Sequence, residues 1–327
     1  MTSVPLLPPP VRFKEVLMSL LPFLRRKPDA PVSPAGQTAA FLQGHSIEVM
    51  PRTAEKVDDF RALLPRGTRV YIAHIDGTPI DDMVRTAARI AAEGFEVMPH
   101  FPARVCRSRA ELADWIARYQ GEAGVRSGLL LGGGVTTPAG EFDSAMQMIE
   151  TGLFDRAGFT RLHVAGHPEG NRDIDIDGGD RIVMQALRWK QAFSQRTDAA
   201  MAITTQFCFE PAPVIAWANR IKAAGIDLPV HIGVAGPAKL QTLIKFAMSC
   251  GVGASVRVLQ RRAMDVTKLL LPYEPTDLVA DLAAHKAEHP DFGIARVHLF
   301  PLGGIKSCAE WAARHGGPSG LSAAINQ

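Results

Sequence analysis

The chain has 327 residues, of which 46% are hydrophobic and 21% charged, a composition typical of a soluble globular protein. This length suffices for one large α/β domain with a substantial core. The 36 basic and 33 acidic side chains give a formal net charge of +3, and no basic tract interleaved with aromatic residues occurs, so a nucleic-acid partner is not indicated. The four cysteines are scattered without a CxxC pair, which favours free thiols in a reducing cytoplasm over a disulfide framework or a zinc site.

Residues 1–40 are rich in proline, and residues 12–25 have the pattern of a short amphipathic helix. We expect an N-terminal arm that packs on the domain or on a neighbouring subunit. The apolar stretch over residues 16–24 is too short to span a bilayer. It also lacks the charge order and the small-residue cleavage site of a secretion signal. A cytoplasmic protein with no membrane partner is therefore expected.

From residue 45 onward, short β-branched and apolar runs alternate with longer segments of helical period. Strands are predicted over residues 45–50, 68–75, 95–101, 127–132, 161–167, 200–207, 229–235 and 295–302. Helices are predicted over residues 81–91, 108–116 and 213–221, and more than one within 237–290; Ser108 and Glu111 form a capping-box pattern. This rhythm predicts a single (β/α)8 TIM barrel over residues 41–315, followed by a tail over 316–327. An open doubly wound sheet is less favoured, because the triple glycine at 132–134 lacks the GxGxxG spacing.

Glu48 stands out because a carboxylate occupies the interior of an apolar strand. Burial without a partner raises the pKa of a carboxyl group, so that it holds a proton near neutrality. Glu48 is therefore a candidate general acid. The alternative is a structural glutamate paired with Arg52 or another cation.

Polar or glycine-rich sequences end six of the predicted strands, and in a (β/α)8 barrel those ends converge on one rim. They carry His74 and Asp76, His100, the glycines 132–134, His167 with Glu169 and Asn171, Gln206, and Phe300 with Gly303 and Gly304. The glycines allow a flat ligand to approach the backbone, and Gln206 offers a donor and an acceptor to a heterocycle. A small-molecule site is predicted there. A metal site built from His74, Asp76, His100 and His167 is disfavoured, because no HxH pair or HExxH motif occurs.

At these residues the chain resembles the methylenetetrahydrofolate reductase family, from about residue 45 to 310. The resemblance rests on four segments: Ser46–Thr53 (SIEVMPRT), Pro99-His100, Val164–Gly170 (VAGHPEG) and Ile203–Phe209 (ITTQFCF). A weaker likeness covers residues 225–247. The resemblance implies a flavoprotein barrel in which Glu48 is the catalytic acid and Gln206 binds the pterin ring of a folate.

By the same resemblance, the substrate-binding residues are Gln206, Phe207, Leu240 and Phe300. The cofactor-binding residues are His74, His100, Gly132, Gly133, Gly134, His167, Glu169 and Asn171, with Arg188 and Lys190 meeting phosphates. The expected cofactors are FAD and NAD(P)H as electron donor or acceptor, and no metal is expected. Family barrels often associate, so a homo-oligomer is expected by analogy.

The chain departs from the family pattern at several flavin-facing positions. Glycines 132–134 stand where the family has Arg-Gly-Asp, Ala73 replaces a threonine, and Asn171 replaces a histidine. Leu240 occupies the place of an aromatic residue. The resulting hypothesis is reversible interconversion of 5,10-methylenetetrahydrofolate and 5-methyltetrahydrofolate, with hydride carried by FAD and Glu48 as the general acid. The alternatives are a flavin-independent NAD(P)H-dependent reductase, a methyltetrahydrofolate oxidase, or a non-catalytic folate-binding accessory subunit.

Overall fold

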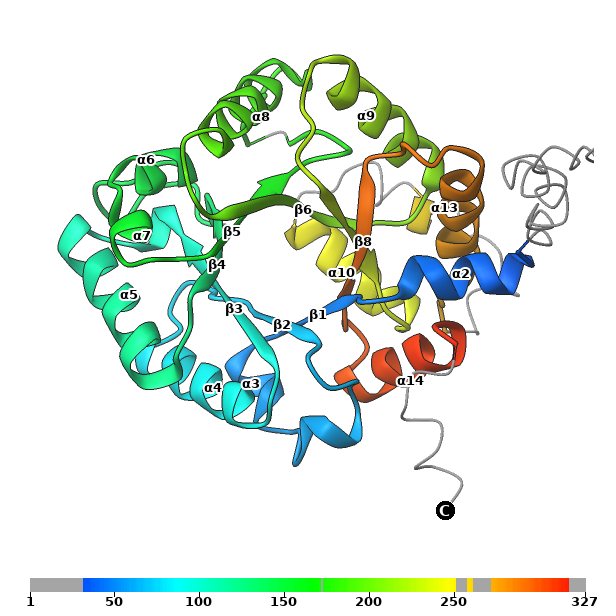
Figure 1. The fold of residues 1–327 in the computed structure, drawn as a ribbon, viewed down its shortest axis with the longest axis horizontal. Coiled ribbons are helices and arrows are strands. Elements are labelled where there is room, and N and C mark those ends of the chain that lie inside the picture. Colours follow the sequence, from blue (N-terminus) through cyan, green and yellow to red (C-terminus); the bar gives the residue numbers. More distant parts are fainter. Residues whose placement is uncertain (1–31, 172, 251–257, 261–271, 318–327) are drawn as a thin grey trace, which may run out of the picture. The chain divides into compact units, whose positions relative to one another are not determined.

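The computed structural model describes residues 32–171, 173–250, 258–260 and 272–317. Eight parallel strands close into a barrel in sequence order, each hydrogen-bonded to the next and β8 to β1. Figure 1 shows these strands as an inner ring with helices around it. The strands are β1 Ser46–Val49, β2 Arg69–Ile72, β3 Glu96–Pro102, β4 Ser127–Leu131, β5 Arg161–Gly166, β6 Ala200–Cys208, β7 Val230–Ala235 and β8 Ile294–Phe300. The predicted (β/α)8 barrel is confirmed, and each predicted strand overlaps an observed one.

The helices follow the strands as the sequence pattern indicates. They are α2 Pro34–Leu42, α3 Pro51–Ala54, α4 Ile80–Ala92, α5 Arg109–Ala123, α6 Ala145–Glu150, α7 Leu153–Arg156, α8 Arg181–Ser194, α9 Pro211–Ala223, α10 Leu240–Ser249, α13 Thr276–Glu288 and α14 Ile305–His315. Two short 3-10 helices, η2 Phe60–Ala62 and η3 Ala103–Val105, complete the connections. The Ser108 side chain accepts a hydrogen bond from the Glu111 N–H at 3.1 Å, as the capping pattern predicts.

The N-terminal boundary differs from the predicted one. Helix α2 begins at Pro34, inside the segment expected to be an arm, and buries Thr38, Phe41 and Leu42. This apolar face packs on α13 and β8, so the compact unit starts several residues earlier than the proline content indicates. The helix predicted over residues 12–25 lies outside the described residues.

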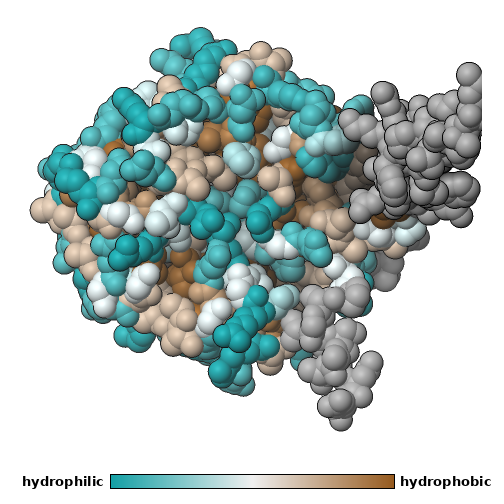
Figure 2. Space-filling model, viewed as in Figure 1, coloured by the Kyte–Doolittle hydropathy of each residue, from teal (hydrophilic) through white to brown (hydrophobic). Residues whose placement is uncertain are grey.

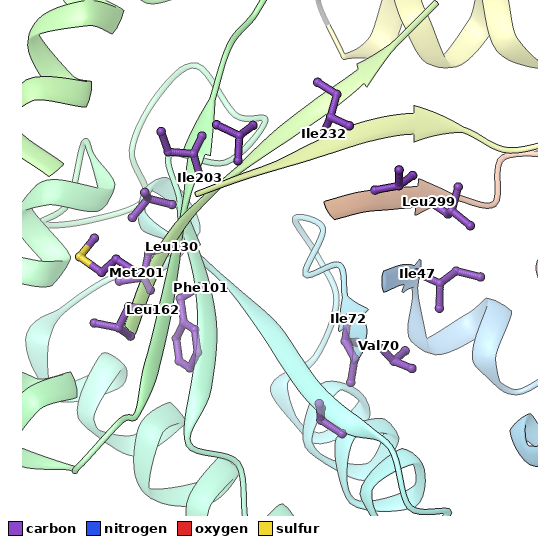
Figure 3. Packing of buried hydrophobic residues seen from close by; sticks show 14 of the residues in the cluster. Ile47, Val70, Ile72, Phe101, Leu130, Leu162, Met201, Ile203, Ile232 and Leu299 are labelled. Atoms are coloured by element: carbon purple, nitrogen blue, oxygen red, sulfur yellow. The ribbon is translucent and has the colours of Figure 1, made fainter. Parts of the chain in front are cut away.

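The main core lies between the strands and the helix ring. Because side chains alternate across a strand, every second residue points outward from the barrel. These outward positions carry apolar side chains; Figure 3 labels Ile47, Val70, Ile72, Phe101, Leu130, Leu162, Met201, Ile203, Ile232 and Leu299 among them. The intervening positions point into the barrel, and several of them are polar, including Glu48, His100, His163 and His298. The barrel interior therefore holds the candidate chemistry, while the outer layer supplies the packing.

The viewed face of the molecule is mixed in hydropathy (Figure 2). Figure 2 shows hydrophilic residues over much of the viewed face, with hydrophobic residues in small groups between them. Within the described ranges, no helix is long and apolar enough to cross a membrane.

Candidate active site

A cavity of about 1490 Å³ opens at the carboxyl ends of the barrel strands. Most of the predicted site residues line it: Glu48, His74, His100, Gly132, Gly133, Gly134, His167, Glu169, Asn171, Gln206, Phe207 and Phe300. The volume exceeds the roughly 300–1000 Å³ usual for a pocket that holds one small molecule. The cavity therefore has room for more than one small molecule.

Three of the predicted residues do not line the cavity. Leu240 is buried at the start of α10, in the apolar cluster that backs the cavity wall. Arg188 is exposed on α8. Lys190 is buried beneath β5, where its Nζ donates a hydrogen bond to the Ala165 carbonyl oxygen at 2.8 Å. The prediction that Arg188 and Lys190 meet cofactor phosphates is therefore not supported by their positions.

Glu48 lies on the cavity floor between two histidines from other strands. Its Oε2 is 3.2 Å from His100 Nε2 and 3.6 Å from His298 Nε2, and the Glu48 side chain keeps 17% exposure. The structural alternative was a pair with Arg52 or another cation; among the described residues no ion pair joins Glu48 to Arg52, and its partners are two imidazoles, which are cations only when protonated. Both imidazole nitrogens are buried, and they lie close to the Glu48 carboxylate without an aligned hydrogen bond to the described residues.

The structure corrects the prediction for the pKa of Glu48. Burial alone raises this pKa, as the sequence suggests, but the charge and proximity of His100, followed by His298, outweigh burial and lower it to about 2. The carboxylate is therefore ionised, and Glu48 does not hold a proton as an isolated buried carboxyl group would.

His298 is held as a neutral partner of Glu48. It is fully buried, and burial lowers its pKa more than the neighbouring carboxylate raises it. Ser46 Oγ lies 2.9 Å from His298 Nδ1. We assign Ser46 as the donor, so that Nδ1 accepts and Nε2 carries the hydrogen that faces Glu48. A neutral donor next to an ionised carboxylate is consistent with the lowered pKa values of both groups.

A β-bulge in β6 places Gln206 at the cavity. Pairing with β7 shifts between Thr204 and Phe207, leaving Thr205 and Gln206 opposite a single residue. The Thr205 hydroxyl accepts from the Gly233 N–H at 2.8 Å and donates to the Gln206 carbonyl oxygen at 2.9 Å. A Cβ at Gly233 would lie 2.5 Å from that carbonyl oxygen, so the bulge requires glycine there.

The wall next to Gln206 is apolar and aromatic. Phe207 and Phe300 pack edge to face with ring centroids 5.4 Å apart. Phe209, Leu240 and Tyr273 lie behind them in one buried cluster. Leu240 thus supports the wall rather than contacting the cavity. A flat heterocycle held by the Gln206 amide finds a hydrophobic surface beside it.

The opposite wall is formed by bare backbone. No heavy atom lies within 4 Å of the position that a Cβ would take at Gly134, and at Gly132 the nearest is the Arg104 guanidinium at 3.7 Å. This wall admits a flat ring against the main chain, which fits the ring system of a flavin or a nicotinamide. Arg104 itself donates to the Asp143 and Val135 carbonyl oxygens, each at 3.0 Å.

Basic side chains other than Arg188 and Lys190 line the cavity. Among the described cavity-lining residues, Arg52, Lys56 and Lys306 are exposed basic side chains. Arg52 lies on α3, Lys56 follows the end of that helix by two residues, and Lys306 lies at the start of α14.

The metal alternative finds no support in the described part of the chain. There, no group of three or more His, Cys, Asp or Glu side chains is arranged to hold a metal ion. His74 instead contacts the Thr78 carbonyl oxygen at 3.1 Å and stacks near Trp115. His167 lines the cavity as a neutral imidazole, because burial, followed by the charge of Lys190, lowers its pKa to about 4.

Sequence reasoning missed the polar groups inside the barrel that support Glu48. Ser46, Tyr71, His163, His231 and His298 lie within strands and are buried. Residues two positions apart on a strand face the same side of the sheet, so a residue such as Ser46 shares the inward face with Glu48. This alternation is the one feature of the sequence that could have identified them. What the sequence does not indicate is which of them meet, because their strands are far apart along the chain.

Comparison with known proteins supports the architecture. No protein-family model matches the sequence. A solved structure of an uncharacterized protein from Clostridium thermocellum that binds two copies of 5-methyl-5,6,7,8-tetrahydrofolic acid is similar, with a TM-score of 0.54 and 10% identity over 84% of this chain and 96% of that chain. A 7,8-dihydropteroate synthase from Vibrio fischeri ES114 matches with a TM-score of 0.38 and 10% identity over 86% and 94% of the two chains, a score on which we base no argument. At these identities the first likeness shows a shared barrel fold.

Proposed function

We propose that the protein interconverts 5,10-methylenetetrahydrofolate and 5-methyltetrahydrofolate in the cavity of the barrel. The observation that carries this proposal is the Glu48–His100 pair on the cavity floor, with an Nε2–Oε2 separation of 3.2 Å. Gln206 and the aromatic wall line the same cavity. The similar barrel from Clostridium thermocellum binds a reduced folate, which adds support for this class of ligand.

The first chemical step needs a proton from the protein. Opening the five-membered ring of the methylene folate breaks the bond between the bridging carbon and N10, and N10 departs only if it is protonated. In our proposal this proton reaches N10 from the Glu48–His100 pair, whose Oε2 and Nε2 atoms lie 3.2 Å apart on the cavity floor. His298 keeps its own hydrogen on Nε2, so it stabilises the carboxylate throughout.

The product of ring opening is an iminium between N5 and the former bridging carbon. Addition of a hydride to that carbon gives the 5-methyl group and completes the balance of one proton and one hydride. A flavin or a nicotinamide bound along the bare backbone of residues 132–134 would supply the hydride. Arg52, Lys56 and Lys306 would hold its phosphates at the cavity mouth.

The pterin ring is held on the other side in this proposal. The Gln206 amide oxygen already accepts from the Phe207 N–H at 3.1 Å, and its amide nitrogen makes no hydrogen bond to the described residues. That nitrogen therefore donates to the pterin edge, while Phe207 and Phe300 contact its face. This arrangement directs the one-carbon unit toward Glu48.

The test is turnover with a matched pair of variants. Purified protein is incubated without oxygen with 5,10-methylenetetrahydrofolate and NADH or NADPH, with and without FAD, and 5-methyltetrahydrofolate is measured by mass spectrometry. The wild type should form product, and Glu48→Gln should lower kcat at least about a hundredfold while folate still binds. Glu288→Gln makes the same change at the exposed end of α13 and should leave kcat unchanged.

Each outcome has a distinct meaning. Near-normal turnover by Glu48→Gln would show that the assigned proton donor is wrong. Folate binding without turnover by the wild type would contradict the proposed reaction and indicate a binding protein. The visible spectrum of the purified protein separates the hydride sources, since a bound flavin absorbs there and a nicotinamide does not.

A further inference from the structure

Tyr71 lies between the two histidines that contact Glu48. It comes from β2, and its side chain is completely buried inside the barrel. Its ring centroid is 4.3 Å from that of His298, in a tilted contact, and 6.3 Å from that of His100, in an edge contact. The Tyr71 ring therefore contacts both His298 and His100, the two imidazoles that lie close to Glu48 Oε2.

The hydroxyl of Tyr71 is fixed on the far side of the barrel. It lies 2.7 Å from His163 Nδ1 on β5 and 3.3 Å from Thr204 Oγ1 on β6. His163 Nδ1 and Thr204 Oγ1 are also 3.1 Å apart, so the three groups form a closed triangle. Tyr71 thus spans the barrel interior from β2 to β5 and β6.

The protonation states of Tyr71 and His163 bear on which of them donates the hydrogen bond between them. Burial raises the pKa of Tyr71 to about 12, so the phenol keeps its hydrogen. Burial also lowers the pKa of His163 well below its usual value, followed by a contribution from His231. We assign Nδ1 of the neutral His163 as the acceptor, so that the Tyr71 O–H is its donor.

We propose that Tyr71 is a positioning residue for the proton-carrying pair, acting through the orientation of His298 and His100. This inference rests on the proposed function, because the pair it positions is the one assigned to proton transfer. With its hydroxyl held by His163 and Thr204, the ring cannot tilt, and both Nε2 atoms stay directed at Glu48 Oε2. Without that anchor the ring moves, and the contact between Glu48 and His298 lengthens.

Several other charged or titratable groups face this network. They are Glu48 on β1, Arg69 on β2, His100 on β3, Arg161 and His163 on β5, His231 on β7, and Arg296 and His298 on β8. None of them is removed by a substitution at Tyr71. If a substitution at Tyr71 changes the proton affinity of the Glu48–His100 pair, the cause is therefore a change in the positions of these groups and not the loss of a charge.

The experiment compares two buried tyrosines. Tyr71→Phe keeps the aromatic ring and removes only the hydroxyl. His163 Nδ1 and Thr204 Oγ1 can still hydrogen-bond to each other, so neither is left without a partner. Tyr119→Phe on α5 is the matched control, because Tyr119 is equally buried and its hydroxyl has no hydrogen-bond partner among the described residues. We expect Tyr71→Phe to lower kcat about tenfold with KM for the folate unchanged, and to shift the acidic limb of the kcat–pH profile. Tyr119→Phe should change neither.

A measurement without turnover keeps this inference separate from the proposed function. Long-range 1H–15N spectra of histidine-labelled protein report the tautomer of each imidazole, and His298→Gln assigns the His298 signal. The wild type should hold His298 as the Nε2–H tautomer between about pH 6 and pH 8, whereas Tyr71→Phe should mix the tautomers. Identical His298 and His100 signals in the two proteins would overturn the inference, even if the wild type fails to turn over folate.

Discussion

Acidification should destabilise this barrel because it buries neutral imidazoles. His231 is 4% exposed, and burial, followed by the charges of Arg69 and His298, lowers its pKa to about 3. In the unfolded chain an imidazole binds its proton below about pH 6.5. Between about pH 6.5 and pH 3 the unfolded state therefore binds more protons than the native state, and the free energy of unfolding falls as the pH falls.

The magnitude follows from the width of this window. At about pH 5, His231 is about 1.5 pH units below its unfolded pKa and still neutral in the native state, which costs about 2 kcal/mol. The lowered pKa values of His163 and His298 act in the same direction. Glu48, with a pKa lowered to about 2, adds a further loss only below about pH 4.5. Against a typical total of about 5–15 kcal/mol, this is a large share of the stability.

The assay is urea unfolding followed by circular dichroism at about pH 7.5, 6 and 5. His231→Gln removes one titrating group, so its stability should fall by about 2 kcal/mol less over this range than that of the wild type. His289→Gln is the matched control, since it makes the same change at an exposed histidine at the end of α13. Equal stability of the wild type at about pH 7.5 and pH 5 would refute the assignment of neutral buried histidines.

Two further predictions concern the folate wall. Gly233→Ala should lower stability by about 1–3 kcal/mol and weaken binding of 5-methyltetrahydrofolate, because the new Cβ would lie 2.5 Å from the Gln206 carbonyl oxygen. Gly121→Ala in α5 is the control; nothing lies within 4 Å of its new Cβ, so it should stabilise the protein by about 0.5–1 kcal/mol. Thermal unfolding measures the stability of both variants, and calorimetric titration measures their affinity for 5-methyltetrahydrofolate. Wild-type affinity in Gly233→Ala would exclude the bulge as the feature that places Gln206. Gln206→Leu keeps the volume but removes the amide, so the Kd for 5-methyltetrahydrofolate should rise about tenfold or more; an unchanged Kd would remove Gln206 from the pterin site.

Local patterns were sufficient to predict the architecture. The strands are short segments rich in β-branched and apolar residues, and the bounds of α4 and the start of α5 follow from helical period and from the Ser108 cap, whereas α5 continues to Ala123, beyond the predicted end at residue 116. Chain order then implies the convergence of strand ends, which brought His74, His100 and Gln206 to one cavity. The positions of strands and helices, and their order along the chain, depend on residues close together in sequence, so they can be predicted from it.

The partners of Glu48 depend on contacts between distant strands. His298 lies 250 residues after Glu48, and no local pattern indicates that β8 closes onto β1 at that register. For this reason the sequence suggested a raised pKa where the structure gives a lowered one. Arg188 and Lys190 were misplaced for a similar reason, since the orientation of α8 on the barrel decides which of its faces is exposed.

The central claim is that a reduced folate binds in the cavity with its one-carbon unit at the Glu48–His100 pair. Calorimetric titration of 5-methyltetrahydrofolate into the wild type at two pH values, in two buffers of different ionisation enthalpy, tests it most directly. We expect saturable binding to the wild type that is coupled to proton exchange. Glu48→Gln should still bind the folate but without the proton exchange. No binding to the wild type, or identical proton exchange in the variant, would contradict it.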